Sequence, residues 1–356
     1  MKFVFFLNSA SPHQIPYIRE LNTCSFVSEL FLVVPKIDSK ERIKLGWNTE
    51  YLLMTSRIRY VLSASCEDVK NILNTSNTYC FFSGIRADSN VFRWFKFSLK
   101  FEVKRYLITE GPYTYNKPLF LHYIRFLLQD YKYIKYISGV FAIGDKAVKY
   151  YKSLSSSWKV YPFQYVTEEI KRNYFSNKGS LKLLYVGSFI KRKNVSFLLK
   201  SLTNISDVSL TLIGSGKNEG ELKKIAKNNN LNVLFESNKS MGDIPLIMQQ
   251  YDVLILPSLH DGWGAVVNEA LSMGLFCLVS DKCGSSALIK NYFNGIIFPL
   301  KESSLVDAIN YCKNNIDVLR NNVTNRIEDS KKINGYSIAK YFVNCILNEN
   351  SSYRHS

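Results

Sequence analysis

The sequence lacks any run of about 18 or more uncharged apolar residues, so no membrane-spanning helix is expected. It also lacks a CxxC pair, and its seven cysteines are scattered and odd in number. This distribution argues against a disulfide framework and a zinc site, and it favours a reducing, cytoplasmic compartment. The opening residues, MKFVFFLNSASPHQ, have an apolar run of only about five residues, which predicts a first buried strand rather than a signal peptide.

Acidic residues are few: 29 Asp and Glu stand against 46 Lys and Arg, so the formal net charge is +17. Residues 92–159 alone hold 13 basic and 4 acidic side chains, interleaved with aromatic residues. Because cations attract an anionic membrane and aromatic rings settle among its headgroups, this segment predicts contact with an anionic membrane surface. The alternatives are a solvated basic face above core aromatics, and nucleic acid as the partner; no specific nucleic-acid binding is expected.

The 356 residues suffice for two domains, because a single hydrophobic core rarely grows beyond about 250–300 residues. Hydrophobic residues make up 46% of the chain, enough to fill both cores. We expect an N-terminal domain over 1–166, a polar linker over 167–180 and a C-terminal domain over 181–330. A last helix and a tail are expected within 331–356.

Short apolar strands alternate with helical spacing in both halves. The predicted strands of the first half span 2–8, 28–34, 79–84, 105–111, 139–145 and 159–165. Those of the second half span 181–188, 208–216, 232–237, 252–258, 276–281 and 295–299. Helices are expected, among others, over 12–23, 118–137, 303–328 and 336–348. The pattern predicts an α/β fold with two Rossmann-like domains, whose parallel sheets face one another across a cleft.

Parallel sheets bind ligands beyond the carboxyl ends of their strands, so the residues after each strand are the candidates. After the strand that ends at Gly187, the loop carries Lys191, Arg192 and Lys193 before a helix expected from about Asn194. Fixed cations beside the N–H groups of a helix start form an anion site, which a diphosphate leaving group requires. An exposed basic loop is the alternative. Gly187 itself is expected to contact the nucleotide. Gly214, after the next strand, marks either a tight turn or one wall of a nucleotide pocket.

The stretch LPSLHDGWGAVVNEALSMG, residues 256–274, ends one strand and opens a helix expected from about Gly264. Three backbone N–H groups at this start are ready for phosphate or sugar oxygens: those of Gly264, Ala265 and Val266. Glu269 can accept two hydrogen bonds from a vicinal diol such as a ribose, and Asp261 can accept from a second group of hydroxyls. A capping aspartate and a solvated glutamate are the ordinary alternatives.

This second half resembles the retaining GT-B-fold glycosyltransferases of the family-4 group. The likeness is specific over about 181–300, which includes KLLYVGSFIKRKNVSFLLKSL, LTLIGSG and YDVLILPSLHDGWGAVVNEALSMG, and only architectural over 1–170. The hallmark of the family is a glutamate, seven residues and a second glutamate. Here Asp261 stands in the first place and Glu269 in the second.

The resemblance implies a role for each matching residue. Glu269 would bind the nucleotide ribose, Asp261 the donor sugar, and the N–H groups around Gly264 the sugar and phosphate. Lys193 matches the diphosphate-binding lysine of the family. The family often has arginine directly after the strand glycine, where this chain has Ser188, so Arg192 is expected to substitute for it.

Two residues of the first half are candidates for contact with the acceptor or the donor sugar. His13 follows the first strand, where the family often has a glycine-rich loop, and a histidine that caps the first helix is the alternative. Glu110 ends a strand at the same predicted edge and would orient or deprotonate the attacking hydroxyl.

The expected activity is metal-independent transfer of a sugar, with retention of configuration, from a nucleotide diphosphate sugar, most simply UDP-linked. The basic first half favours a lipid-linked saccharide acceptor and assembly of a surface polysaccharide at the inner face of the cell membrane. The alternatives are a GT-B-fold nucleotide-sugar epimerase or hydrolase, and a non-catalytic subunit that binds nucleotide or glycan.

Overall fold

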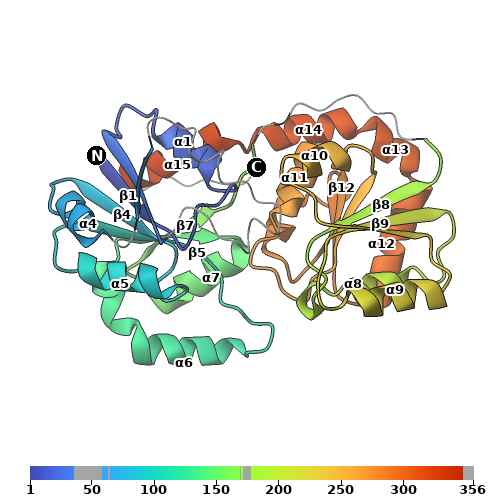
Figure 1. The fold of residues 1–356 in the computed structure, drawn as a ribbon, viewed down its shortest axis with the longest axis horizontal. Coiled ribbons are helices and arrows are strands. Elements are labelled where there is room, and N and C mark those ends of the chain that lie inside the picture. Colours follow the sequence, from blue (N-terminus) through green and yellow to red (C-terminus); the bar gives the residue numbers. More distant parts are fainter. Residues whose placement is uncertain (36–57, 63–64, 169, 171–177, 348–356) are drawn as a thin grey trace. The chain divides into compact units, whose positions relative to one another are not determined.

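The computed structural model describes residues 1–35, 58–62, 65–168, 170 and 178–347 (Figure 1). Most of the predicted linker 167–180 and the tail after residue 347 lie outside the described residues. The described chain forms two compact units. Of the described residues, unit 1 comprises 1–35, 58–62, 65–168 and 334–347, and unit 2 comprises 170 and 178–333.

Unit 1 is built on a seven-stranded sheet in the order β3-β2-β1-β4-β5-β6-β7, in which every paired strand is parallel. Its strands are β1 (Lys2–Phe6), β2 (Glu29–Val34), β3 (Arg59–Leu62), β4 (Thr78–Phe82), β5 (Lys104–Glu110), β6 (Gly139–Ile143) and β7 (Lys159–Phe163). The six strands predicted in this half are confirmed, and β3 was not predicted. β4 and β6 are buried along their whole length because the sheet is covered on both faces.

The helices of unit 1 are α1 (Ile15–Leu21), α4 (Cys66–Leu73), α5 (Ser89–Ser98), α6 (Leu119–Gln129), α7 (Asp145–Leu154) and α15 (Gly335–Leu347), with a 3₁₀ helix η1 (Tyr131–Tyr136). The last helix, α15, packs beside α1 (Figure 1). Its Phe342 stacks on Phe141 with ring centroids 4.3 Å apart, so α15 covers one face of the sheet. The contact is close, because a Cβ on Gly335 would lie 2.7 Å from the carbonyl oxygen of Pro16.

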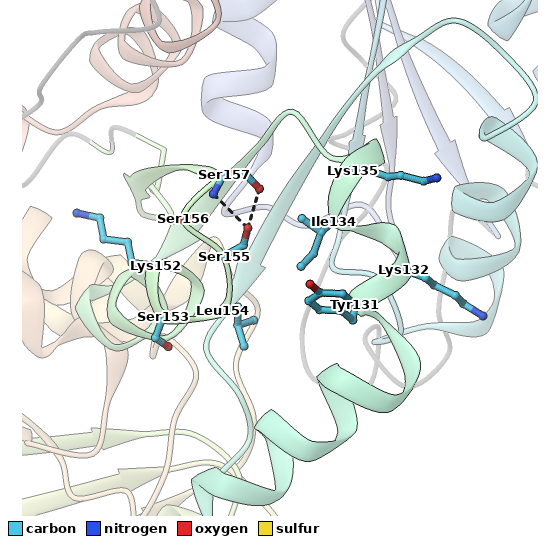
Figure 2. Close-up of a pocket in the computed structure, with 10 residues that line it drawn as sticks. All are labelled: Tyr131, Lys132, Ile134, Lys135, Lys152, Ser153, Leu154, Ser155, Ser156 and Ser157. Carbon is cyan, nitrogen blue, oxygen red and sulfur yellow. Dashed lines mark hydrogen bonds between the residues drawn. The ribbon is translucent and has the colours of Figure 1, made fainter.

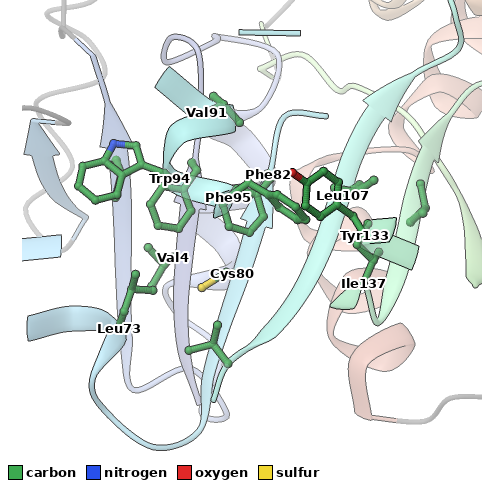
Figure 3. Close-up of a cluster of buried hydrophobic side chains, with 14 of the residues drawn as sticks. Val4, Leu73, Cys80, Phe82, Val91, Trp94, Phe95, Leu107, Tyr133 and Ile137 are labelled. Atoms are coloured by element: carbon green, nitrogen blue, oxygen red, sulfur yellow. The ribbon is translucent and has the colours of Figure 1, made fainter. Parts of the chain in front are cut away.

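The opposite face of this sheet is covered by α5, as Figure 3 shows. Trp94 and Phe95 of α5 are buried, and Phe95 meets Phe82 edge to face at 5.2 Å. These aromatic residues belong to the basic segment for which a membrane surface was predicted. In α5, therefore, the alternative to a membrane surface applies, which is a solvated basic face above core aromatic residues. The aromatic rings fill the core, and the cations between them lie above it.

Unit 2 holds a six-stranded parallel sheet in the order β10-β9-β8-β11-β12-β13. Its strands are β8 (Leu181–Val186), β9 (Val208–Ile213), β10 (Val233–Glu236), β11 (Val253–Leu256), β12 (Phe276–Ser280) and β13 (Gly295–Phe298). All six were predicted. The α/β class with two Rossmann-like parallel sheets is thus confirmed.

Helices cover both faces of this sheet, over two separate apolar clusters. They are α8 (Val195–Ser201), α9 (Glu219–Asn228), α10 (Asp243–Met248), α11 (Val266–Ser272), α12 (Glu302–Asn314), α13 (Ile316–Asn321) and α14 (Val323–Lys331), with 3₁₀ helices η2 (Lys191–Lys193) and η3 (Gly284–Leu288). The single helix predicted over 303–328 is wrong, since the chain leaves helical geometry at Asn315 and Asn322.

Strand order fixes where a ligand is expected in unit 2. The chain moves outward from β8 to β9 and β10, and then returns to the other side of β8 with β11. Neighbouring strands whose connections leave in opposite directions form a topological switch point, which is where open α/β sheets bind ligands. The loops that follow β8 and β11 are therefore the first to consider.

Candidate functional site

The loops after β8 and β11 are joined by direct hydrogen bonds. The N–H of Leu259 donates to the carbonyl oxygen of Arg192 at 2.9 Å, and Asn194 Nδ2 donates to the carbonyl oxygen of Pro257 at 3.2 Å. Asn194 has φ 57° and ends η2 in the left-handed region, so α8 begins at Val195, one residue later than predicted. These contacts hold the short cationic helix η2 against the turn that precedes α11.

Two predicted cations converge on one predicted carboxylate. Lys193 Nζ lies 2.5 Å from Asp261 Oδ2, and Arg192 Nη1 lies 3.7 Å from Asp261 Oδ1. Arg192 Nη1 also donates to the carbonyl oxygen of His260 at 2.7 Å. All three charged side chains are largely buried. The cluster thus carries two positive charges and one negative charge at the switch point.

Asp261 is held through its backbone as well. Its carbonyl oxygen accepts the N–H of Gly284 at 3.0 Å, and its own N–H donates to the carbonyl oxygen of Lys282 at 3.4 Å. A Cβ on Gly284 would lie 2.1 Å from the carbonyl oxygen of Gly262, so only glycine allows the loop after β12 to approach so closely. The loops after β8, β11 and β12, three neighbouring strands of the sheet, therefore meet at Asp261.

Gly264 turns the chain into α11. Its φ of +95° belongs to the region that favours glycine, and a Cβ there would lie 2.7 Å from Leu256 Cδ2 and 2.9 Å from Ser285 Oγ. α11 begins at Val266, two residues later than predicted. The first hydrogen bond of this turn runs from the N–H of Val267 to the carbonyl oxygen of Gly264 at 3.0 Å. The N–H groups of Gly264, Ala265 and Val266 thus precede that bond, where helix starts lack intrahelical acceptors.

Glu269 lies in α11, more than one turn beyond Gly264, and is partly buried. Burial raises the pKa of its carboxyl group to about 8 from an ordinary 4.5. The side chain is therefore mainly protonated at pH 7 in the ligand-free protein. The residue pattern predicted a carboxylate that accepts two hydrogen bonds, and the structure adds that this carboxylate must first lose a proton.

The glycines after β8 and β9 have a steric role. A Cβ on Gly214 would lie 2.0 Å from the carbonyl oxygen of Gly187, and one on Gly216 would lie 2.5 Å from that of Phe189. The N–H of Phe189 donates to the carbonyl oxygen of Ser215 at 2.8 Å. Gly214 and Gly216 thus permit two loops to pass in contact, which explains both residues without a ligand. Contact of Gly187 or Gly214 with a nucleotide stays a prediction.

Two serines that no sequence motif indicated are buried in this region. Within the described part of the chain, neither Ser258 Oγ nor Ser285 Oγ has a hydrogen-bond partner. Ser258 follows Pro257, the first residue after β11, and Ser285 lies beside Gly264. Their proximity to the turn depends on tertiary structure, and the only sequence signal was their position just after strands.

Glu110 ends β5 and lines a pocket of about 240 Å³ within unit 1. The other walls come from the loops after β4 and β5 and from α6 and α7. Near it, Arg86 Nε lies 2.5 Å from Asp130 Oδ1. His13 follows β1 at the same edge of the sheet, where its carbonyl oxygen accepts the N–H of Val166 at 3.2 Å. It is not among the residues that line the pocket of Glu110, so the structure does not bring the two predicted residues into one pocket.

In the described part of the chain, no three His, Cys, Asp or Glu side chains are grouped so as to hold a metal ion. Over the same residues, no helix combines the length and apolar character needed to cross a bilayer.

Comparison with known proteins bears on the C-terminal half most directly. Residues 166–330 match the family model described as "Glycosyl transferases group 1". The chain is 35% identical over 101 residues to UDP-Gal:alpha-D-GlcNAc-diphosphoundecaprenol alpha-1,3-galactosyltransferase of Escherichia coli, a match that covers 28% of this chain. It is 35% identical over 103 residues to the putative glycosyltransferase EpsF of Bacillus subtilis, covering 27% of this chain. These matches span only 25% and 26% of the relatives' own lengths.

Solved structures match over nearly the whole chain. The Anabaena protein Alr3699/HepE in complex with UDP gives a TM-score of 0.73 at 13% identity, covering 97% of this chain and 99% of that one. The lipopolysaccharide outer core galactosyltransferase WaaB in its apo form gives 0.70 at 15% identity, covering 98% and 100%. At these identities the likeness establishes the fold. Residues 166–330 are therefore similar to the glycosyl transferases group 1 domain, in a chain that has the two Rossmann-like α/β units of the GT-B fold.

Proposed function

We propose that this protein is a retaining glycosyltransferase that transfers a sugar from a UDP-sugar to a hydroxyl of a lipid-linked saccharide during assembly of a surface polysaccharide. The observation that carries the proposal is the cluster of Lys193, Arg192 and Asp261 at the switch point of unit 2. A cationic cluster beside a helix start fits a diphosphate better than any neutral ligand.

The reaction assigned to this cluster breaks the bond between the anomeric carbon and the diphosphate oxygen. The electron pair of that bond passes to the departing diphosphate, whose growing charge Lys193 and Arg192 stabilise without a metal ion. The acceptor hydroxyl forms the new bond to the anomeric carbon on the same face. Its proton passes to the departing phosphate oxygen. The configuration at the anomeric carbon is retained because the acceptor attacks on the face from which the diphosphate departs.

Asp261 has two tasks in this scheme. Before the donor binds, it holds Lys193 at 2.5 Å and so fixes the ammonium group in place. With the donor bound, its remaining acceptor capacity serves a hydroxyl of the sugar. Aspartate is one methylene shorter than the glutamate that the family motif has here, and the ion pair with Lys193 shows that the shorter side chain still reaches the cation.

The nucleotide half of the donor is assigned to the other side of the turn. The ionised Glu269 accepts hydrogen bonds from the two ribose hydroxyls, and the N–H groups of Gly264, Ala265 and Val266 donate to sugar and phosphate oxygens. Gly187 and Gly214, which follow β8 and β9, are assigned to the wall of the nucleotide pocket. UDP as the nucleotide is supported by one sequence relative, which is named as a UDP-Gal-dependent galactosyltransferase, and by one structural neighbour solved in complex with UDP.

Unit 1 is assigned to the acceptor, with Glu110 as the group that orients the attacking hydroxyl and His13 as a contact to sugar. The pocket around Glu110 supports the first assignment, because it opens at the carboxyl ends of β4 and β5. The relative that acts on a diphosphoundecaprenol-linked sugar supports a lipid-linked acceptor. With the net charge of +17, this favours peripheral association with the inner face of the cell membrane.

A panel of nucleotide sugars, offered with and without a GlcNAc-diphospholipid acceptor in the presence of EDTA, tests the proposal. Release of nucleotide that depends on the acceptor, and an unchanged anomeric configuration in the product by NMR, are expected. Release without acceptor would indicate a hydrolase instead. Conversion of the donor sugar would indicate an epimerase, and tight binding without turnover a non-catalytic subunit. Activity that EDTA abolishes would refute the metal-independent scheme.

A further inference from the structure

Helix α6 exposes its apolar side chains. Of its eleven residues only Phe126 is buried, and Leu127 and Leu128 are 61% and 80% exposed. Six large side chains recur at helical spacing along this surface, here named the α6 apolar face: Phe120, Leu121, Ile124, Leu127, Leu128 and Tyr131. In Figure 1, α6 is the outermost helix of unit 1, on the side away from α1 and α15. Contiguous exposed apolar surface of this kind marks an interaction site.

The inward side of α6 is fixed by aromatic and polar contacts. Phe126 meets Trp158 edge to face at 5.7 Å, and Tyr123 Oη lies 2.7 Å from Ser153 Oγ. His122 Nε2 lies 2.9 Å from the carbonyl oxygen of Tyr113. The orientation of the helix is therefore set by unit 1 itself. Its apolar side faces outward because a different side of the helix makes these contacts.

Cations border the α6 apolar face. Exposed basic side chains lie before, on and after the helix: Lys117, Arg125, Lys132 and Lys135. Between residues 111 and 144 the sequence has one acidic residue, Asp130, which is buried and paired with Arg86. The surface is thus apolar in its centre and positive at its edge, and residues 111–144 add no exposed negative charge to it.

A hollow lies beside the end of α6, between η1 and the turn 153–157 (Figure 2). Tyr131, Ile134 and Leu154 line it. Ser155 and Ser157 line it too, and their Oγ atoms are hydrogen-bonded to each other at 2.7 Å. Lys132, Lys135 and Lys152 also belong to its lining, and in Figure 2 their side chains extend outward from it. The serine hydroxyl groups of the hollow, with lysine side chains directed to either side of it, suit the polar, negatively charged headgroup layer that adjoins an inserted apolar helix.

We propose that α6 is the element through which this protein docks on an anionic lipid bilayer, with the α6 apolar face inserted among the acyl chains and the flanking cations on the headgroups. Charge decides the occupant. A second copy would bring a net charge of +17 and the same basic border to the interface, whereas anionic lipids complement both. Helices with an apolar face and a basic border bind in the plane of the membrane interface.

Sedimentation with vesicles tests this docking without any sugar chemistry. The full-length protein should bind vesicles with 30% phosphatidylglycerol more tightly than pure phosphatidylcholine vesicles, and added salt should weaken that binding. The double variant Leu127→Gln, Leu128→Gln should lose about tenfold or more in affinity, since two apolar insertions are removed. Lys132→Gln with Lys135→Gln should lose roughly tenfold on anionic vesicles and little on neutral ones.

A matched control removes two exposed leucines elsewhere. Leu234 on β10 and Leu246 on α10 are 55% and 44% exposed, and the double variant Leu234→Gln, Leu246→Gln should bind vesicles as the unaltered protein does. Thermal unfolding shows that each variant is folded. Equal binding by the α6 variant and the unaltered protein, or no vesicle binding by the unaltered protein, would refute the proposal. A change in oligomeric mass in the α6 variant, with vesicle binding intact, would point to a second copy and also refute it.

Discussion

Nucleotide binding should be coupled to ionisation of Glu269, and the pH dependence of affinity should reveal it. Burial raises the pKa of this carboxyl group to about 8, so most molecules carry a neutral side chain at pH 7. A neutral carboxyl accepts hydrogen bonds from a ribose diol less well than a carboxylate does. Affinity for UDP should therefore rise as pH rises through this pKa.

The size of the effect follows from the ionised fraction. With a pKa of about 8, roughly 9% of the side chains are ionised at pH 7 and roughly 76% at pH 8.5. If only the ionised form binds UDP, the apparent affinity is proportional to the ionised fraction of Glu269. It should therefore increase roughly eightfold over this range. The phosphate of UDP, with a second pKa near 6, is largely ionised throughout and adds little.

Isothermal titration calorimetry of UDP binding at pH 7.0, 7.5, 8.0 and 8.5 measures the slope. Titrations in two buffers of different ionisation enthalpy show whether a proton is released, and about one proton per UDP is expected at pH 7. The variant Glu269→Gln keeps the shape of the side chain but cannot ionise. Its affinity should be low and flat over the same range.

Protein stability gives an independent check of the same pKa. Between pH 4.5 and 8 the folded protein holds a proton that the unfolded chain has lost, so this group lowers the free energy of unfolding by about 1.4 kcal/mol for each unit of rising pH. The loss should stop above pH 8 and should be absent in Glu269→Gln. A flat affinity profile in the unaltered protein, or an equal slope in the variant, would refute the reasoning about Glu269.

Further substitutions test other parts of unit 2. Arg320 pairs with the buried Asp252 at 3.0 Å, so Arg320→Ala should lower the free energy of unfolding by about 3–5 kcal/mol in urea titrations. Gly214→Ala should destabilise unit 2, because the new Cβ would lie 2.0 Å from a carbonyl oxygen; the melting temperature measures this. Lys193→Ala should reduce kcat more than donor binding in transfer assays, and an unchanged kcat would contradict the leaving-group role. Glu269→Ala should abolish the preference for UDP over deoxy-UDP, and equal loss of affinity for both would contradict the ribose role.

Most strands were predictable because a strand buried on both faces is an apolar run of β-branched and aromatic residues. β3 was missed since its four residues, Arg59–Leu62, include a charged side chain and lie at the edge of the sheet. Helix ends were less predictable. The start of α11 moves from Gly264 to Val266 because Gly264 has a φ of +95°, which no sequence pattern specifies.

The site was predictable in its residue types and not in its pairings. Lys193 and Asp261 are 68 positions apart, and their contact follows from β8 and β11 lying side by side in the sheet. The neutral state of Glu269 depends on burial, which a single sequence does not report. The two helices of the basic aromatic segment 92–159 differ for the same reason. Aromatic residues of α5 are buried, whereas α6 exposes its apolar side chains. Helical spacing in the sequence does not show which side of a helix faces outward.

The charges of unit 2 favour an anion before any donor arrives. Arg192 and Lys193 carry two positive charges and Asp261 one negative charge, while Glu269 adds almost none at pH 7 because of its raised pKa. A fully ionised Glu269 would cancel the excess at this sheet edge and weaken the attraction for a diphosphate. Burial of Glu269 therefore serves the first step of binding, and the ribose then favours the carboxylate once the phosphates are in place. On this view the nucleotide binds in an order, diphosphate before ribose. At pH 7 inorganic diphosphate should therefore bind Glu269→Gln as tightly as the unaltered protein, whereas UDP should bind the variant more weakly.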